Sequence, residues 1–438
     1  MVRLAIPADS LAVLMAAFVG VFMAAFLGVF VGVFVGVLVA TILATSRASA
    51  SLKNLRLPGL LATLLATVTL NTALAADTID GPTIAAKSWL LVDVTSGQIL
   101  ASHKPDDQFE PASLTKLMTA YLAFSALREG RLQPELRPPV SAKAYKAIGS
   151  RMFVDPLQPA TVDELLRGMI VQSGNDASII LAEAIAGSEE AFAQNMNRAA
   201  VQMGMTNSSF ENATGLPGPK HFSTARDLAT LAIRLIIDHP QHYPMYSEKE
   251  YTYNNIKQQN RNRLLFIDPA VDGVKTGYTQ AAGYCLIASA ERDQPGGGFS
   301  RRLLSVVLGA ESASGRAVES QKLLNYGFQN FDALRIYRQG QSTGSYRVWK
   351  GEIAQVEGSV AHDVIVTIPK GANQRVSAEI ERIEPLVAPI EKGQRIGTLR
   401  VRLDNQQLLE QQLIAQSSVT QGGWFARLWD GLRMRVSR

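Results

Sequence analysis

Three short polar clusters lie far apart along this chain of 438 residues, and they constrain its fold more than any other feature. They are Ser113-Leu114-Thr115-Lys116, Ser173-Gly174-Asn175 and Lys275-Thr276-Gly277. Together they supply a hydroxyl nucleophile, an amine beside it, a second hydroxyl and a second amine, which suffice for acyl transfer without histidine or metal. A fold that uses them must bring three distant segments to one place.

The first cluster predicts a nucleophile and its base. A helix that opens at Pro111 and runs to about Arg128 places Ser113 and Lys116 on one face, about one turn apart. The helix dipole there favours negative charge that develops at Ser113. Lys116 acts as a base only when it is neutral, and burial or a nearby cation would lower its pKa to that end. Alone, this spacing also fits an ordinary helix face.

The second cluster lies between two helical patterns and predicts a proton relay. The hydroxyl of Ser173 would pass a proton toward the leaving group. Asn175 would donate to a substrate carbonyl and hold Lys116 in place. Alone, the tripeptide would be a connector whose polar residues cap the next helix.

The third cluster lies in an apolar stretch, residues 271–279, that predicts an edge strand. Because Gly277 has no side chain, a substrate backbone could lie against this strand. Lys275 and Thr276 would meet a substrate carboxylate.

Two further residues are candidates for substrate binding. The backbone N–H of Tyr278 could join that of Ser113 in an oxyanion hole. Arg261, in Asn260-Arg261-Asn262-Arg263, is a second candidate anchor for the carboxylate, or an exposed loop arginine.

Composition narrows the class of function. The net charge of +5 comes from scattered cations, which is not the pattern of a nucleic-acid groove. The five histidines show no metal-binding spacing, so neither a zinc site nor another cofactor is expected. The one cysteine, Cys285, lies in an apolar run and is expected to be a buried structural thiol.

The first 75 residues are expected to target the chain and to lie outside the fold. Residues 11–45 are almost wholly apolar and long enough to cross a bilayer, or they are low-complexity sequence without a role. Residues 52–75 follow the layout of a signal peptide, and Ala73-Leu74-Ala75 predicts cleavage before Ala76.

The rest of the chain divides into three parts. Residues 76–334 alternate strand and helix patterns, which predicts an α/β (α+β) domain: an antiparallel sheet of early and late segments with a helical cluster packed on it. Residues 335–417 show short alternating runs and predict a small all-β domain. In residues 418–438, two tryptophans share one helical arc and several arginines lie off it, which favours a helix lying on an anionic membrane over one docked on the protein.

The three clusters in their wider context resemble those of the serine-type D-alanyl-D-alanine carboxypeptidases, the low-molecular-mass penicillin-binding proteins. The matching stretches are residues 111–119, 172–177 and 272–277, and the resemblance covers about residues 83–420. It includes the β domain, and the amphipathic C-terminus is found in the membrane-tethered members.

The resemblance implies a transpeptidase-like fold, an acyl-enzyme on Ser113 with Lys116 as base, and removal of the terminal D-alanine from peptidoglycan pentapeptide stems. It also implies acylation by β-lactams and an exported protein, periplasmic or on the outer face of the cytoplasmic membrane, held there by its C-terminal helix. Tyr278 stands where some members carry histidine.

Three rival functions remain open from sequence. A serine β-lactamase shares two of the clusters, but we find no convincing Glu-x-x-x-Asn pattern for rapid deacylation between Asn175 and Lys275. A D,D-endopeptidase would cut cross-links with the same residues. A wall-binding protein without catalysis would not need the Ser113–Lys116 pair.

Overall fold

The computed structural model describes residues 81–436, which form the core of one compact unit, residues 79–438. The predicted targeting region, residues 1–75, lies outside the described residues. Within the described part, no helix is both long and apolar enough to span a bilayer.

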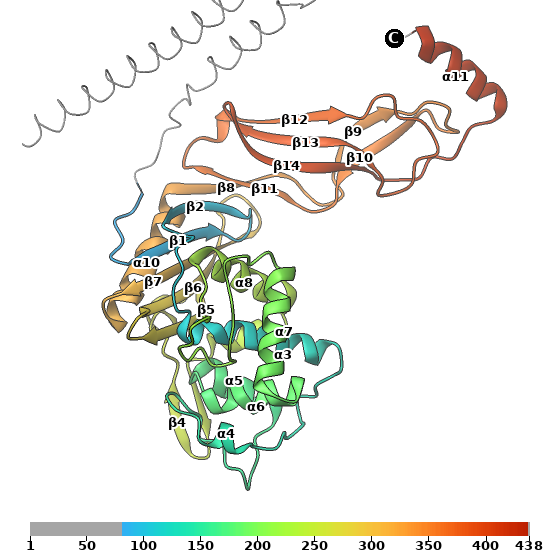
Figure 1. Ribbon diagram of the computed structural model, residues 1–438. Coiled ribbons are helices and arrows are strands. Elements are labelled where there is room, and N and C mark those ends of the chain that lie inside the picture. The colour runs from blue at the N-terminus through green and yellow to red at the C-terminus, as the bar shows by residue number, and fades with distance from the viewer. Residues whose placement is uncertain (1–80, 437–438) are drawn as a thin grey trace, which may run out of the picture. The chain divides into compact units, whose positions relative to one another are not determined.

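An antiparallel sheet of five strands in the order β2-β1-β7-β6-β5 organises the first part of the chain (Figure 1). Its early strands pair directly with its late ones, as the sequence predicted. The strands are β1 (Ser88–Asp93), β2 (Gln98–His103), β5 (Val271–Thr279), β6 (Gly283–Asp293) and β7 (Ser300–Ala310).

Helices cover both faces of this sheet. Successive side chains of a strand point to opposite faces. Accordingly, Leu90 and Val92 of β1 belong to the same apolar cluster as α8 (Ala225–Asp238), whereas Leu91 belongs to another cluster with α10 (Ala313–Asn330). Every residue of β1 is therefore buried.

The remaining helices, together with the small hairpin of β3 and β4, form the cluster that the sequence predicted between the early and late strands (Figure 1). Several begin at a side-chain cap, and Thr161 and Glu164 form a reciprocal capping box at the start of α5. The elements of this cluster are η1 (Ala112–Thr115), α3 (Lys116–Arg128), α4 (Ala142–Tyr145), α5 (Val162–Val171), α6 (Asn175–Ala186), α7 (Glu189–Gln202), η2 (Tyr243–Ser247), β3 (Glu250–Tyr253), β4 (Ile256–Gln259) and α9 (Leu264–Ile267).

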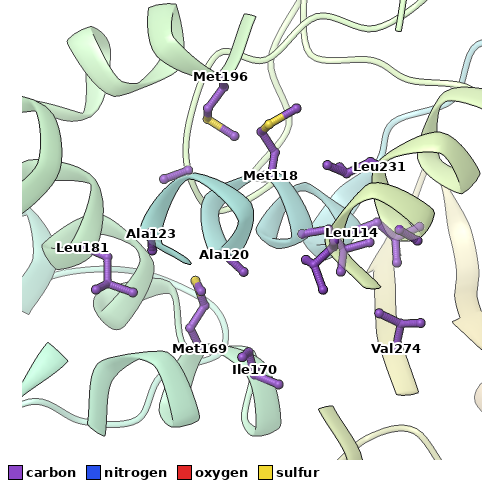
Figure 2. Close-up of a cluster of buried hydrophobic side chains, with 14 of the residues drawn as sticks. Leu114, Met118, Ala120, Ala123, Met169, Ile170, Leu181, Met196, Leu231 and Val274 are labelled. Atoms are coloured by element: carbon purple, nitrogen blue, oxygen red, sulfur yellow. The ribbon is translucent and has the colours of Figure 1, made fainter. Parts of the chain in front are cut away.

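Helix α3 is the centre of this cluster. Figure 2 shows Met118, Ala120 and Ala123 on it, with Met169 and Leu181 from neighbouring helices close by. All of them are buried, and burying a side chain such as Met or Leu contributes about 1.5–3 kcal/mol. The start of α3 is therefore held rigidly, which matters for the residues just before it.

The second part of the described chain is all-β, also as predicted. Strands β8 and β11 form one pair, and a five-stranded sheet follows in the order β12-β13-β14-β10-β9. Helix α11 (Trp424–Val436) ends the described chain. The strands are β8 (Phe331–Tyr337), β9 (Ser342–Arg347), β10 (Gln355–Val360), β11 (Val364–Pro369), β12 (Val376–Arg382), β13 (Arg395–Leu403) and β14 (Gln406–Ala415).

Candidate active site

Ser113 lies in the 3-10 turn η1, which runs directly into α3 at Lys116. The sequence predicted one continuous helix here, and the structure tightens its first turn instead. Ala112 has a positive φ of 49°, which is strained for a residue with a side chain. Gly215 explains how this turn is held, since a Cβ there would come within 1.8 Å of the carbonyl oxygen of Ala112.

Lys116 is 1% exposed, and its ammonium group contacts oxygen atoms from three segments. Nζ lies 3.1 Å from Oγ of Ser113, 2.7 Å from Oδ1 of Asn175 and 2.5 Å from the carbonyl oxygen of Thr214. Burial, and then the charge of Arg261, lower the pKa of Lys116 to about 7. The neutral amine is therefore accessible near neutral pH.

The contacts of Lys116 decide which way its lone pair points. A neutral amine has two N–H groups, and the oxygens of Asn175 and Thr214 can only accept. With both N–H groups directed to them, the lone pair is left for the hydroxyl of Ser113.

Ser173 and Asn175 come from the turn that opens α6. The hydroxyl of Ser173 is buried, has no hydrogen-bond partner among residues 81–436, and lines the same cavity as Ser113. Its residue has a positive φ of 62°, a strained conformation that is typical of functional turns. Nδ2 of Asn175 donates to the carbonyl oxygen of Ile148 at 2.6 Å, which keeps its Oδ1 directed at Lys116.

The third cluster lies on β5, beside η1. Lys275 is buried, and its pKa is well below the usual range because of burial first and of Lys116 and two arginines next. Gly277 lies so close to the turn that a Cβ would be 3.2 Å from the carbonyl oxygen of Pro111. The structure thus brings all three clusters together, and β5 is the edge strand of its sheet as predicted.

A cavity of about 490 Å³ opens among these segments. Such a volume fits a small peptide end. Arg261 is at the surface and contributes to the wall. Tyr278 is exposed, and its ring packs at a tilt against that of Tyr284. The lining residues are Ser113, Gly149, Ser150, Ser173, Arg261, Thr276, Gly277, Tyr278, Tyr284 and Arg316.

Arg316 was not among the sequence-based candidates. It comes from the first turn of α10, where its Nη1 donates to the carbonyl oxygen of Gly277 at 3.0 Å. It is 8% exposed, and burial lowers its pKa to about 10. No sequence motif includes this arginine, because α10 follows the last strand of the first sheet along the chain. Its place at the site becomes visible only once α10 packs on β6 and β7.

A supporting loop, residues 210–221, holds the carbonyl that Lys116 contacts. Oδ1 of Asn212 accepts hydrogen bonds from the N–H groups of Thr214 and Gly215. The loop is tied to η1 by His221, whose Nε2 lies 2.8 Å from Oγ1 of Thr115. Burial lowers the pKa of His221 to about 4, so its ring is neutral near pH 7.

A serine hydroxyl at a cavity with a buried lysine beside it, at the edge of an antiparallel sheet and with several cations nearby, defines a serine-type hydrolase of the penicillin-binding class. The chain belongs to the D-alanyl-D-alanine carboxypeptidase family, whose sequence pattern matches residues 75–312. Residues 331–421 match the C-terminal domain of penicillin-binding protein 5.

Named relatives agree with this assignment. D-alanyl-D-alanine carboxypeptidase DacC of Escherichia coli K12 is 40% identical over 374 residues, which are 83% of this chain and 92% of DacC. DacA of Haemophilus influenzae is 39% identical over 81% of this chain and 90% of its own length. The crystal structure of penicillin-binding protein 5 from H. influenzae matches with a TM-score of 0.74 at 39% identity, over 78% of this chain and 100% of that one.

Proposed function

We propose that this chain removes the terminal D-alanine from peptidoglycan pentapeptide stems through an acyl-enzyme on Ser113. The observation that carries the proposal is the amine of Lys116, 3.1 Å from Oγ of Ser113 and with a pKa of about 7. The family and the names of the relatives support the same activity. They do not favour a β-lactamase or an endopeptidase.

Acylation follows from the contacts of Lys116. Its lone pair takes the proton of Ser113 as Oγ attacks the carbonyl carbon between the last two D-alanines. The bond from Oγ to that carbon forms, and negative charge moves to the carbonyl oxygen, to which the N–H groups of Ser113 and Tyr278 are proposed to donate hydrogen bonds.

Collapse of this intermediate breaks the carbon–nitrogen bond. The proton held by Lys116 passes through the hydroxyl of Ser173 to the leaving amine, which departs as D-alanine. The relay is consistent with the burial of Ser173 and with its place in the cavity wall. Water then attacks the carbonyl carbon of the ester while Lys116 takes its proton. The bond from that carbon to Oγ breaks, Lys116 returns the proton to Oγ of Ser113, and the shortened stem leaves as a carboxylic acid.

The specificity for a chain end comes from the cations at the cavity. A terminal D-alanine carries a free carboxylate, which a cross-linked stem lacks. We assign its binding to Thr276, Arg261 and Arg316 in the cavity wall, with Lys275 behind them. β-Lactams also carry a carboxylate beside a reactive carbonyl, so they would occupy the same position as inhibitors.

The C-terminal helix is proposed to hold the exported enzyme at a membrane surface. Its large apolar side chains are 52–70% exposed. A helix docked on the protein would bury them instead. A hydrogen bond links the helix to the β domain, where Oδ2 of Asp430 accepts from the backbone N–H of Lys350. The exposed residues are Trp424, Phe425, Leu428, Trp429 and Leu432.

One experiment tests the catalytic proposal directly. The purified protein is incubated with a labelled β-lactam, its intact mass is measured, and the modified peptide is mapped. We expect one adduct, on Ser113, and none in Ser113→Ala, while release of D-alanine from a pentapeptide is abolished by the same change. Labelling that persists in Ser113→Ala would remove Ser113 from its role, and rapid turnover of a chromogenic cephalosporin would favour the β-lactamase.

Deletion of residues 420–438 tests the anchor separately. The shortened protein is expected to move to the soluble fraction and to release D-alanine as before. Retention on membranes would contradict the role of α11.

A further inference from the structure

A second cavity, of about 850 Å³, lies where β7, the end of α10 and the first strand of the β domain meet. It shares no lining residue with the cavity at Ser113. Its walls carry five cationic side chains and two carboxylates. The cations are Arg292, Arg301, Arg335, Arg338 and Lys370, and the carboxylates are Asp293 and Asp332.

The most informative of these residues is Arg301, which is 1% exposed. Its Nε donates to Oδ2 of Asp93 at 2.6 Å, and its Nη1 donates to the carbonyl oxygen of Phe331 at 2.7 Å. Its Nη2 has no hydrogen-bond partner anywhere in residues 81–436. A guanidinium N–H that is buried without an acceptor is costly, and here it belongs to a residue of the cavity wall.

Two exposed cations add to this group. Arg338 and Lys370 line the same cavity and are exposed, and the charge of Arg338 also helps to lower the pKa of Asp363. The other two arginines are already engaged, Arg292 with Asp268 and Arg335 with Asp363. The carboxylates of the wall are engaged as well, since Asp293 accepts from Oγ of Ser300 and Asp332 from the backbone N–H of Gly371. Arg301 therefore has a buried N–H group without an acceptor, and Arg338 and Lys370 add exposed positive charge to the cavity.

We propose that this cavity binds an oxyanion, a carboxylate or a phosphate group, with Nη2 of Arg301 as a buried donor and Arg338 and Lys370 as exposed ones. A guanidinium presents its donors in the geometry that such anions accept. The volume exceeds that of one such group, so the anion is part of a larger molecule. Its source is either the carboxylate of a peptide from the cell wall or a phosphorylated compound. The site takes part in no catalytic step, so it stands apart from the function proposed above.

The test uses the full chain with its active site blocked by a β-lactam, because the cations near Ser113 also attract anions. Inorganic phosphate and N-acetylglutamate are titrated separately and followed by calorimetry. We expect saturable one-to-one binding of at least one probe, and at least ~10-fold weaker binding in Arg338→Ala/Lys370→Ala, since two charge-assisted contacts are lost. A phosphate-only response identifies a phosphate source, and a response to N-acetylglutamate identifies a carboxylate source.

A matched control carries the same charge change elsewhere. Arg198→Ala/Lys392→Ala removes one exposed arginine and one exposed lysine outside the cavity and is expected to bind like the parent. Arg301→Lys then tests the buried donor, because it retains a cation beside Asp93 but has no Nη2, and it is expected to weaken binding ~10-fold. Absence of binding in the parent, or equal binding by the cavity variant and its control, would overturn the proposal.

Discussion

Two buried cations in this molecule have opposite surroundings. Lys116 contacts only neutral oxygen atoms, and burial and Arg261 outweigh the more distant carboxylates of Asp176 and Glu189, so its pKa falls to about 7. Arg301 is equally buried but lies against the carboxylate of Asp93, 2.6 Å away. A lysine buried without a carboxylate in contact gives up its proton easily and can serve as a base, whereas a guanidinium paired with a carboxylate holds structure together.

The largest effect is expected from Lys116→Met, which replaces the base by a side chain of similar length. Acylation by a β-lactam should slow by about 10³–10⁴-fold, because proton removal from Ser113 is lost. The unfolding free energy at pH 6 should rise, since the variant no longer buries an ammonium group whose desolvation outweighs the attraction of Asp176 and Glu189. Stopped-flow labelling and urea unfolding measure the two effects, and a variant that was both inactive and destabilised would contradict the contrast with Arg301.

The converse change is Asp93→Ala, which leaves Arg301 buried without its counter-ion. We expect a loss of about 3–5 kcal/mol in the free energy of unfolding. Asp93 also accepts a hydrogen bond from Oγ1 of Thr367 in the β domain. The substitution should therefore destabilise both the part that holds Ser113 and the β domain. The folded fraction should still bind one β-lactam per chain.

A matched control for Asp93→Ala is Asp106→Ala, which breaks the exposed ion pair with Arg226. Its cost should stay within about 1 kcal/mol. Equal losses in the two variants, measured by urea unfolding, would show that burial of the Asp93 pair carries no special weight.

Substitution of Arg316 tests the proposal that some cations of the active site bind the substrate carboxylate and do not transfer protons. Arg316→Gln should raise KM for a pentapeptide by about 10–100-fold, the cost of one charge-assisted contact, and change kcat less. Steady-state release of D-alanine gives both constants. An effect confined to kcat would place Arg316 with the catalytic groups.

The sequence predicted the fold class and the residues of the three clusters as site residues, because both follow from local patterns. Strand alternation, the helix after Pro111 and the spacing from Ser113 to Lys116 are all readable within a few residues. It did not reveal the carbonyl of Thr214, the side chain of Arg316 or the pairing of Asp93 with Arg301. Each of these depends on segments that meet only after folding, and no local pattern of residues records which backbone oxygen or which carboxylate a distant cation will meet.

The pH dependence of acylation gives the smallest effect and the sharpest test of the neutral amine. Because Lys116 acts in its neutral form with a pKa of about 7, the rate should rise about tenfold per unit of pH below 7 and level off above it. Arg261→Gln removes a charge that lowers this pKa, so its profile should shift to higher pH. The free energy of unfolding should also rise with pH. Between about pH 7 and 10.5 Lys116 is protonated in the unfolded chain but neutral in the folded one, so each step up in pH favours the folded state. A flat rate between pH 5.5 and 8, in a protein that stays folded by circular dichroism, would show that Lys116 is not the base.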